Sequence, residues 1–86
     1  MNVYIVIAHK ESKMQGYIDT KYSFNLAAYK NEEDAQFSVK RMVDRYLTDS
    51  AYTIHSYGDN FVEYSLKGFE FDRFKYTYEI ETHALL

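Results

Sequence analysis

The chain has no cysteine, no proline and no tryptophan, and it has only three glycines among its 86 residues. Without cysteine, it can form no disulfide, no thiol nucleophile and no zinc–thiolate site. Its longest apolar run, Val3–Ala8, is far too short to span a bilayer, and no basic segment of the secretory type precedes it. These absences favour a soluble protein of the cytoplasm.

The length predicts one small domain, covering residues 1–86. The net charge is −3 with both signs mixed, so the basic excess typical of nucleic-acid binders is missing. Tyrosine is abundant, with 10 residues beside 6 phenylalanines. Tyrosine combines a large contact area with a polar tip, which suits binding surfaces, although aromatic residues are also generally favoured in strands.

The first part of the chain predicts two antiparallel strands. Val3–His9 is apolar on both faces and rich in β-branched residues, which predicts a central strand covered on both sides or nearly so. Lys10–Gly16 is polar and ends in glycine, which predicts a loop or hairpin tip, and part of this long connection, Tyr17–Thr20, could extend the strands. Lys21–Tyr29 alternates as a half-buried strand does. Its predicted apolar face consists of Tyr22, Phe24, Leu26 and Ala28.

One amphipathic helix is predicted over Asn31–Leu47. Asn31 is a good N-cap, because its side-chain oxygen can accept hydrogen bonds from the first turn. Glu32, Glu33 and Asp34 place negative charge at the positive end of the helix dipole. The residues at core spacing are Ala35, Val39, Met42, Val43, Tyr46 and Leu47.

Three further strands are predicted, over Tyr52–Tyr57, Phe61–Leu66 and Phe74–Ala84. The fold class is therefore α+β, an antiparallel β-sheet of about five strands in the order β-β-α-β-β-β with one amphipathic helix packed on one face. A single helix covers one face of the sheet, so the other face must be solvated or covered by a partner.

The stretch FEFDRFKYTYEI, residues 69–80, changes the parity of its apolar positions at Asp72–Arg73. Either these two residues form a tight turn, or a β-bulge shifts the register within one long strand. A turn without glycine is chemically poor for a tight hairpin, so we favour the bulge, with Lys67–Gly68 as the hairpin tip.

No catalytic or metal motif stands out. His9, His55 and His83 lack metal-ligand spacing, and the sequence has neither a nucleophile elbow nor a phosphate-binding loop. Glu79 and Glu81 share one strand face, which is typical of a solvated surface. We therefore predict that the protein is not an enzyme and binds no metal and no cofactor.

Phe37 lies opposite the core stripe of the predicted helix, among charged residues. An isolated surface aromatic is common, and a loop or the C-terminal tail is an alternative cover for it. An aromatic ringed by charge is also typical of interface centres. We hypothesise that Phe37, Lys40, Arg41 and Asp44 form a partner-binding or self-association surface.

A second candidate surface interleaves aromatic and basic residues of the predicted sheet. Aromatic platforms beside cations are how several small domains stack unpaired bases. Nearby acidic residues, Glu63, Glu70 and Asp72 among them, would repel phosphate. The residues of this alternative site are Tyr64, Lys67, Phe69, Arg73 and Lys75.

The segment AAYKNEEDAQFSVKRMVDRYL and the opening MNVYIVIA resemble small uncharacterised phage and bacterial accessory domains over the first half of the chain. The resemblance implies a sheet-plus-helix domain that modulates host machinery, and it transfers no functional residue. We therefore predict a protein-binding inhibitory or regulatory module, plausible as a phage-encoded anti-host or anti-defence protein in the host cytoplasm. Its partner would be a host or defence protein, with a homodimer as a further expectation. The alternative is an RNA-, single-stranded-DNA- or nucleotide-binding domain that uses the sheet aromatics.

Overall fold

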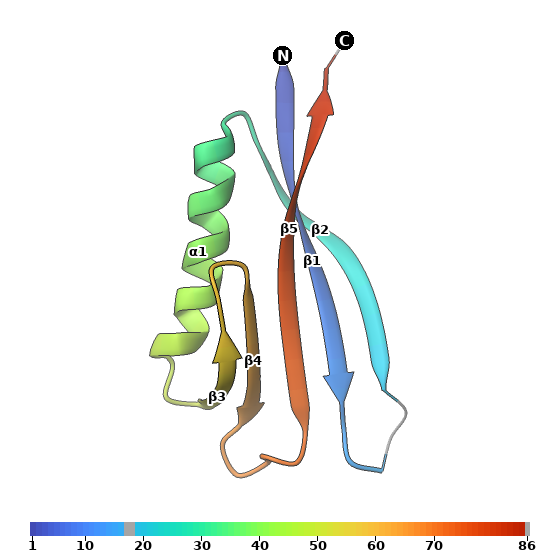
Figure 1. Cartoon of the computed structure of the whole chain (residues 1–86), viewed down its shortest axis with the longest axis vertical. Coiled ribbons are helices and arrows are strands. Elements are labelled where there is room, and N and C mark those ends of the chain that lie inside the picture. Colours follow the sequence, from blue (N-terminus) through green and yellow to red (C-terminus); the bar gives the residue numbers. More distant parts are fainter. Residues whose placement is uncertain (17–18, 86) are drawn as a thin grey trace.

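A computed structural model describes residues 1–16 and 19–85 as one antiparallel sheet with a single helix against it (Figure 1). Its elements are β1 (Asn2–Lys13), β2 (Thr20–Tyr29), α1 (Glu32–Thr48), β3 (Tyr52–Tyr57), β4 (Phe61–Leu66) and β5 (Arg73–Ala84). The strand order across the sheet is β2-β1-β5-β4-β3. The predicted fold class and element order are confirmed, whereas residues 17–18 of the predicted strand extension lie outside the described residues.

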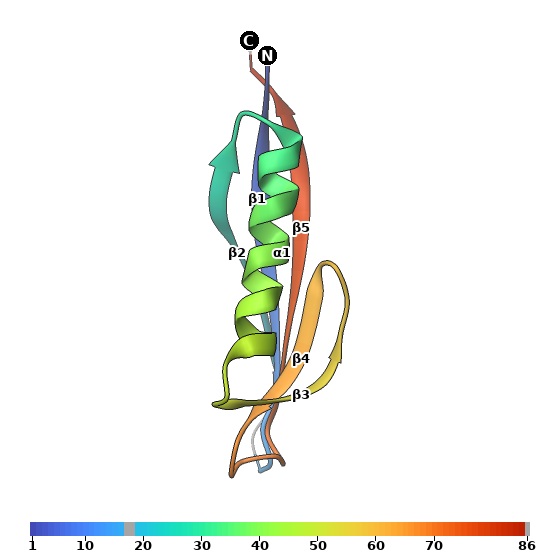
Figure 2. The same cartoon turned by 90° about the vertical axis from the view of Figure 1, so that its left-hand side faces the viewer.

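The sheet consists of two hairpins joined by its last strand. β1 pairs with β2 and, along its whole length, with β5. β4 pairs with β3, but it pairs with only a short part of β5, from Phe74 to Thr77. Residues 79–84, which we call the upper part of β5, therefore have β1 on one side, and no described strand lies on their other side (Figure 2).

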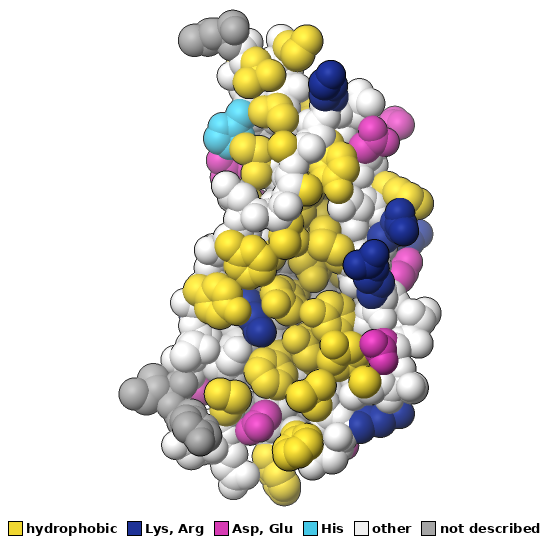
Figure 3. All heavy atoms as spheres, turned by 180° about the vertical axis from the view of Figure 1, so that it is seen from behind, with side chains coloured by type: hydrophobic (Ala, Val, Ile, Leu, Met, Phe, Trp, Pro, Cys, Tyr) yellow, Lys and Arg dark blue, Asp and Glu magenta, His cyan; other side chains and the backbone are white. Residues whose placement is uncertain are grey.

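The helix is shorter than the strands it covers. Its 17 residues extend over about 25 Å, whereas the 12 residues of β5 extend over about 40 Å. α1 therefore covers only part of one sheet face. Seen from behind, the lower half of the molecule shows a broad hydrophobic surface (Figure 3).

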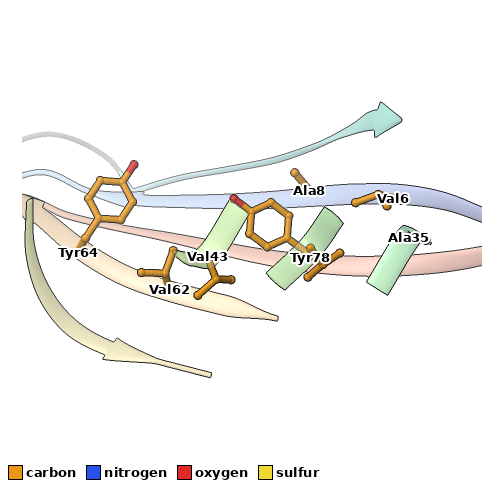
Figure 4. Close-up of a cluster of buried hydrophobic side chains, with 8 residues drawn as sticks. Val6, Ala8, Ala35, Val43, Val62, Tyr64 and Tyr78 are labelled. Atoms are coloured by element: carbon orange, nitrogen blue, oxygen red, sulfur yellow. The ribbon is translucent and has the colours of Figure 1, made fainter. Parts of the chain in front are cut away.

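The core lies between α1 and the even-numbered residues of the central strands (Figure 4). Ala35, Val39 and Val43 are the buried helix residues, and Met42, Tyr46 and Leu47 are partly buried beside them, which confirms the predicted core stripe. Their buried partners on the sheet are Val6, Ala8, Val62, Tyr64 and Tyr78.

Three details of the predicted elements are wrong. β1 continues to Lys13, because most of the predicted loop Lys10–Gly16 pairs with β2 and β5. β1 is not covered on both faces, since Ile5 and Ile7 lie partly exposed opposite the helix. Asn31 is the N-cap residue as predicted, but its side chain makes no cap hydrogen bond, and its amide donates to Asp34 at 3.2 Å instead.

Asp72–Arg73 is neither a bulge nor a tight turn, so the favoured bulge is wrong. β4 ends at Leu66 and β5 begins at Arg73, so Phe69 and Phe71 belong to the connecting loop, where they are 63% and 81% exposed. The apolar positions change parity here because the loop ends and β5 begins at Arg73. The predicted turn at Lys67–Gly68 is present, and Gly68 adopts a φ of +89°.

Register shifts occur instead in the two edge strands. In β2, Leu26 is the extra residue, since Ala27 pairs with Val6 and Asn25 pairs with Ile7. The shift moves Ala28 off the helix side, contrary to its predicted place beside Phe24. In β3 the extra residue is His55.

Candidate functional site

A groove of about 450 Å³ opens where the sheet extends beyond the cover of the helix. We call it the aromatic groove. Its walls are formed by β2, β5, the C-terminal half of α1, Asp49 and the start of β3. Its lining residues are Phe24, Leu26, Met42, Arg45, Tyr46, Asp49, Tyr52, Tyr76 and Tyr78.

Tyr46 of α1 is the centre of the aromatic contacts at this site. Its ring centroid lies 4.6 Å from that of Tyr64, 4.9 Å from that of Tyr52 and 5.9 Å from that of Tyr76. Tyr76 in turn stacks on Tyr78 at 5.9 Å, with the ring planes 7° apart. These tyrosines form a continuous, closely packed array along one wall of the groove.

The wall formed by β2 is open to solvent. Phe24 meets Tyr76 edge to face at 6.5 Å and stacks on Tyr22 at 5.8 Å. Tyr22 is 50% exposed and Leu26 is 41% exposed. The aromatic array therefore runs from the buried core to the surface of an edge strand.

Charged side chains flank the aromatic rings. The Nζ of Lys10 lies 5.5 Å from the ring centroid of Phe74 and 5.3 Å from that of Tyr76, within the range of cation–π attraction. Arg45 and Asp49 line the groove itself. The site thus combines an apolar interior with charges of both signs at its border.

Burial changes the acidity of the tyrosines at this site. It raises the pKa of Tyr46, Tyr64 and Tyr78 above the ordinary value of 10.0, and the neighbouring Tyr46 raises the pKa of Tyr64 and Tyr78 further. These hydroxyls are therefore protonated at neutral pH, and each can donate and accept a hydrogen bond. Such a surface suits a bound apolar or aromatic group that carries polar atoms at its edge.

The predicted partner-binding residues all lie exposed on α1. Phe37 is 62% exposed, so within residues 1–16 and 19–85 neither a loop nor the C-terminal tail covers it. The guanidinium of Arg41 lies 5.9 Å from the ring centroid of Phe37. Both line a second hollow of about 530 Å³ between α1 and β2. Lys40 lines a different hollow on the β5 side, and Asp44 lines none of the three hollows named here.

The predicted nucleic-acid-binding residues do not share one surface. Tyr64 is only 6% exposed and belongs to the core on the helix side, so it is not available to stack on a base. Lys75 faces the opposite side, where its Nζ lies 5.2 Å from the ring centroid of Phe61. A guanidinium nitrogen of Arg73 lies 3.5 Å from Glu63. Lys67 and Phe69 lie in the loop after β4.

A polar row crosses three strands on the face opposite the helix. The Nδ1 of His9 lies 2.6 Å from Ser23 Oγ, and its Nε2 lies 2.8 Å from Glu79 Oε2. Since the carboxylate can only accept, Nε2 carries a proton, and in the neutral imidazole Nδ1 accepts from the Ser23 hydroxyl. Sequence periodicity did not predict this row, because only the strand register places Ser23 opposite His9.

The other two histidines also bond to neighbours. His55 bonds through Nε2 to Ser65 Oγ at 2.7 Å, and His83 contacts Glu81 of its own strand. Within residues 1–16 and 19–85, no group of three or more His, Asp or Glu side chains could hold a metal ion. No helix in this part of the chain is long and apolar enough to cross a membrane.

Comparisons of the chain with protein-family models, with curated proteins and with solved structures found no match. The class that the structure defines is an α+β domain with one antiparallel sheet and one helix.

Proposed function

We propose that this chain is a small protein-binding module whose aromatic groove receives an apolar side chain of a partner protein. The observation that carries the proposal is the open groove of about 450 Å³, lined by packed tyrosine rings on one side and exposed along β2. Aromatic residues in such preformed hollows are typical of interface centres, because they gain contact area at a low cost in conformational entropy.

The binding surface extends toward Phe37 and Arg41. The aromatic groove and the hollow beside Phe37 share Leu26, Met42 and Arg45, so the two are neighbours along α1 and β2. This continuity supports a role for Phe37 and Arg41, two of the four partner-binding residues proposed from the sequence. The regulatory or inhibitory effect of the binding and the phage origin stay predictions.

The charges around the groove favour a particular kind of partner segment. Lys10, Arg41 and Arg45 flank the apolar surface, beside the carboxylates of Asp34 and Asp49. An apolar or aromatic side chain next to an acidic residue matches this pattern, because the acidic group can pair with a cation at the border.

A nucleobase is the second candidate occupant. The stacked pair of Tyr22 and Phe24 is partly exposed beside Lys10, whose cation lies over Tyr76. A base could stack on this pair while Lys10 approaches a phosphate. Such binding would weaken steeply as salt rises, whereas an apolar contact would not.

The experiment is an NMR titration with two matched peptides, acetyl-Asp-Phe-Asp-amide and acetyl-Asp-Ala-Asp-amide, and with a short oligothymidine. We expect the phenylalanine peptide to shift the amide signals of Leu26, Met42 and Arg45 more than the alanine peptide does. Leu26→Glu should abolish this difference. Tyr57→Glu is the matched control, because Tyr57 is 61% exposed and lies outside the groove.

Equal shifts with the two peptides would overturn the proposal. Salt-sensitive shifts at Tyr22, Phe24 and Lys10 with the oligothymidine alone would establish the second candidate instead.

A further inference from the structure

The upper part of β5 is an open sheet edge. The β3–β4 hairpin makes its last backbone contact with β5 at Tyr78, whose N–H donates to the Asn60 carbonyl at 2.8 Å. Amide groups alternate in direction along a strand, so the N–H groups of Ile80 and Thr82 point the same way, away from β1. In agreement, the N–H of Leu85 points the opposite way and donates to Met1 at 2.7 Å.

This edge lacks the bulges, lysines and prolines that often prevent strands from pairing with another chain. Natural edge strands are interrupted by bulges, lysines or prolines. β2 has a bulge at Leu26, and β3 is six residues long with a bulge at His55. β5 is in continuous register with β1, and residues 79–84 include no lysine and no proline.

We propose that two copies of this chain pair antiparallel through their β5 edges to form one continuous sheet. The register that fits places Thr82 opposite Thr82 of the second copy. Glu81 then lies opposite His83 of the second copy, and Ile80 lies opposite Ala84 of the second copy. Each even-numbered pair can exchange two backbone hydrogen bonds, because its N–H groups point outward.

Charge selects this register among its neighbours. A two-fold axis at Glu81 would place Glu81 directly opposite itself, and an axis at Ile80 would place Glu79 opposite Glu81 of the second copy. Like charges in direct opposition are destabilising, whereas opposite partners attract. Of these three axes, only the one at Thr82 leaves no carboxylate opposite another carboxylate, and it opposes Glu81 to His83 on both sides of the axis.

The geometry of the odd-numbered pairs strengthens this contact. They are the non-hydrogen-bonded pairs of the new ladder, in which Cα atoms approach to about 4.5 Å and side chains lie closest. Glu81 and His83 already contact each other within one chain. In the dimer, two carboxylates and two imidazoles alternate around the two-fold axis.

Nothing described in the molecule covers this edge. α1 lies over one face of the sheet, and the outer side of the upper part of β5 is open in both views (Figures 1 and 2). The aromatic groove contains only Tyr76 and Tyr78 of β5, below the proposed contact. The two proposals can therefore fail independently. An interface of one strand edge is small, so we expect a weak, concentration-dependent dimer.

The test is sedimentation equilibrium of the wild type over a range of protein concentrations, compared with Thr82→Pro and Thr82→Val. Proline removes an N–H that points away from β1, whereas valine keeps it. We expect a reversible dimer for the wild type and Thr82→Val, and a dimer at least about tenfold weaker for Thr82→Pro. Circular dichroism checks that each variant is folded.

A charge exchange provides a second test that does not depend on proline. His83→Glu should weaken the dimer about tenfold, because it places glutamates opposite each other. Adding Glu81→His to that variant should restore it, since the exchanged pair is again complementary. A wild type that stays monomeric at its highest soluble concentration would overturn the proposal. So would a dimer that Thr82→Pro and His83→Glu leave unchanged.

Discussion

The ring of Tyr46 on α1 stacks on the ring of Tyr64 on β4, with the centroids 4.6 Å apart and the planes 29° apart. The same Tyr46 ring contacts Tyr52 of β3 and Tyr76 of β5. One half-buried side chain therefore joins the helix to three strands, and it also forms part of the aromatic groove. Fold stability and the shape of the groove depend on the same contacts.

Removing the Tyr46 ring should destabilise the fold clearly. Tyr46→Ala should lower the free energy of unfolding by about 2 kcal/mol, because it deletes a half-buried ring that packs against three others. Tyr46→Phe keeps the ring and should cost less than about 1 kcal/mol. Urea denaturation measures both. Tyr57→Ala removes an exposed ring and should change stability by less than about 0.5 kcal/mol. A cost for Tyr57→Ala as large as that for Tyr46→Ala would contradict this account.

The protein should lose stability above pH 10. A tyrosine in the unfolded chain ionises near pH 10, whereas burial keeps Tyr46, Tyr64 and Tyr78 protonated to higher pH in the fold. In that range the unfolded state binds fewer protons than the folded state, so the free energy of unfolding falls as pH rises. Absorbance at 295 nm reports tyrosine ionisation, and far-UV circular dichroism reports the fold. As pH rises, a late phase of ionisation should coincide with the loss of the circular dichroism signal. Replacing Tyr64 and Tyr78 by phenylalanine should shrink that late phase. Complete ionisation in an intact fold would contradict the prediction.

Ser65 should be essential to the loop that follows β4. Its side chain is fully buried, its hydroxyl donates to the Asp72 carbonyl at 2.6 Å, and His55 Nε2 donates to its oxygen at 2.7 Å. Ser65→Ala leaves both partners without this bond and should cost about 1–3 kcal/mol. Chymotrypsin should then cleave faster at Phe69 and Phe71. Ser56→Ala, an exposed change in the same hairpin, should alter neither measurement, and equal effects of the two variants would refute the role of Ser65.

The expectation that the protein is not an enzyme can be tested at the polar row. Ser23 has a base, His9, within hydrogen-bond distance, but His9 and Glu79 keep 32% and 55% of their side-chain surfaces exposed. Electrostatic activation of a hydroxyl is weak in contact with water. A fluorophosphonate should label neither Ser23 nor Ser56, an exposed serine that serves as the control. Labelling of Ser23 that disappears in His9→Ala would show a reactive nucleophile and contradict the expectation.

Local patterns were sufficient to predict most of the elements. The helix was placed within one residue at each end, because its apolar spacing and acidic first turn are encoded over a few neighbouring residues. The bounds of β3 and β4 were predicted as observed. The loop at Phe69–Phe71 was misjudged because aromatic alternation resembles a strand. The end of this loop is bonded to Ser65 and to Gln15, whose N–H donates to the Asp72 carboxylate from the other end of the sequence.

The candidate site depended on information that no local pattern contains. Phe24, Leu26 and Tyr46 were all assigned to predicted core faces, whereas in the structure they border an open groove between α1 and the sheet. The row of Ser23, His9 and Glu79 likewise depends on the pairing of three strands. Register and coverage are tertiary properties, so periodicity could not predict them.

The order of the strands has a consequence for how the chain folds. β1 and β5 are adjacent in the sheet but come from opposite parts of the sequence, and β5 alone connects the β1–β2 hairpin to the β3–β4 hairpin. Each hairpin and the helix can form from near neighbours, whereas the sheet becomes continuous only when the last strand inserts between them. This closure across most of the chain has a large entropic cost, so it should limit the folding rate. A chain still being synthesised would hold two separate hairpins until β5 emerged.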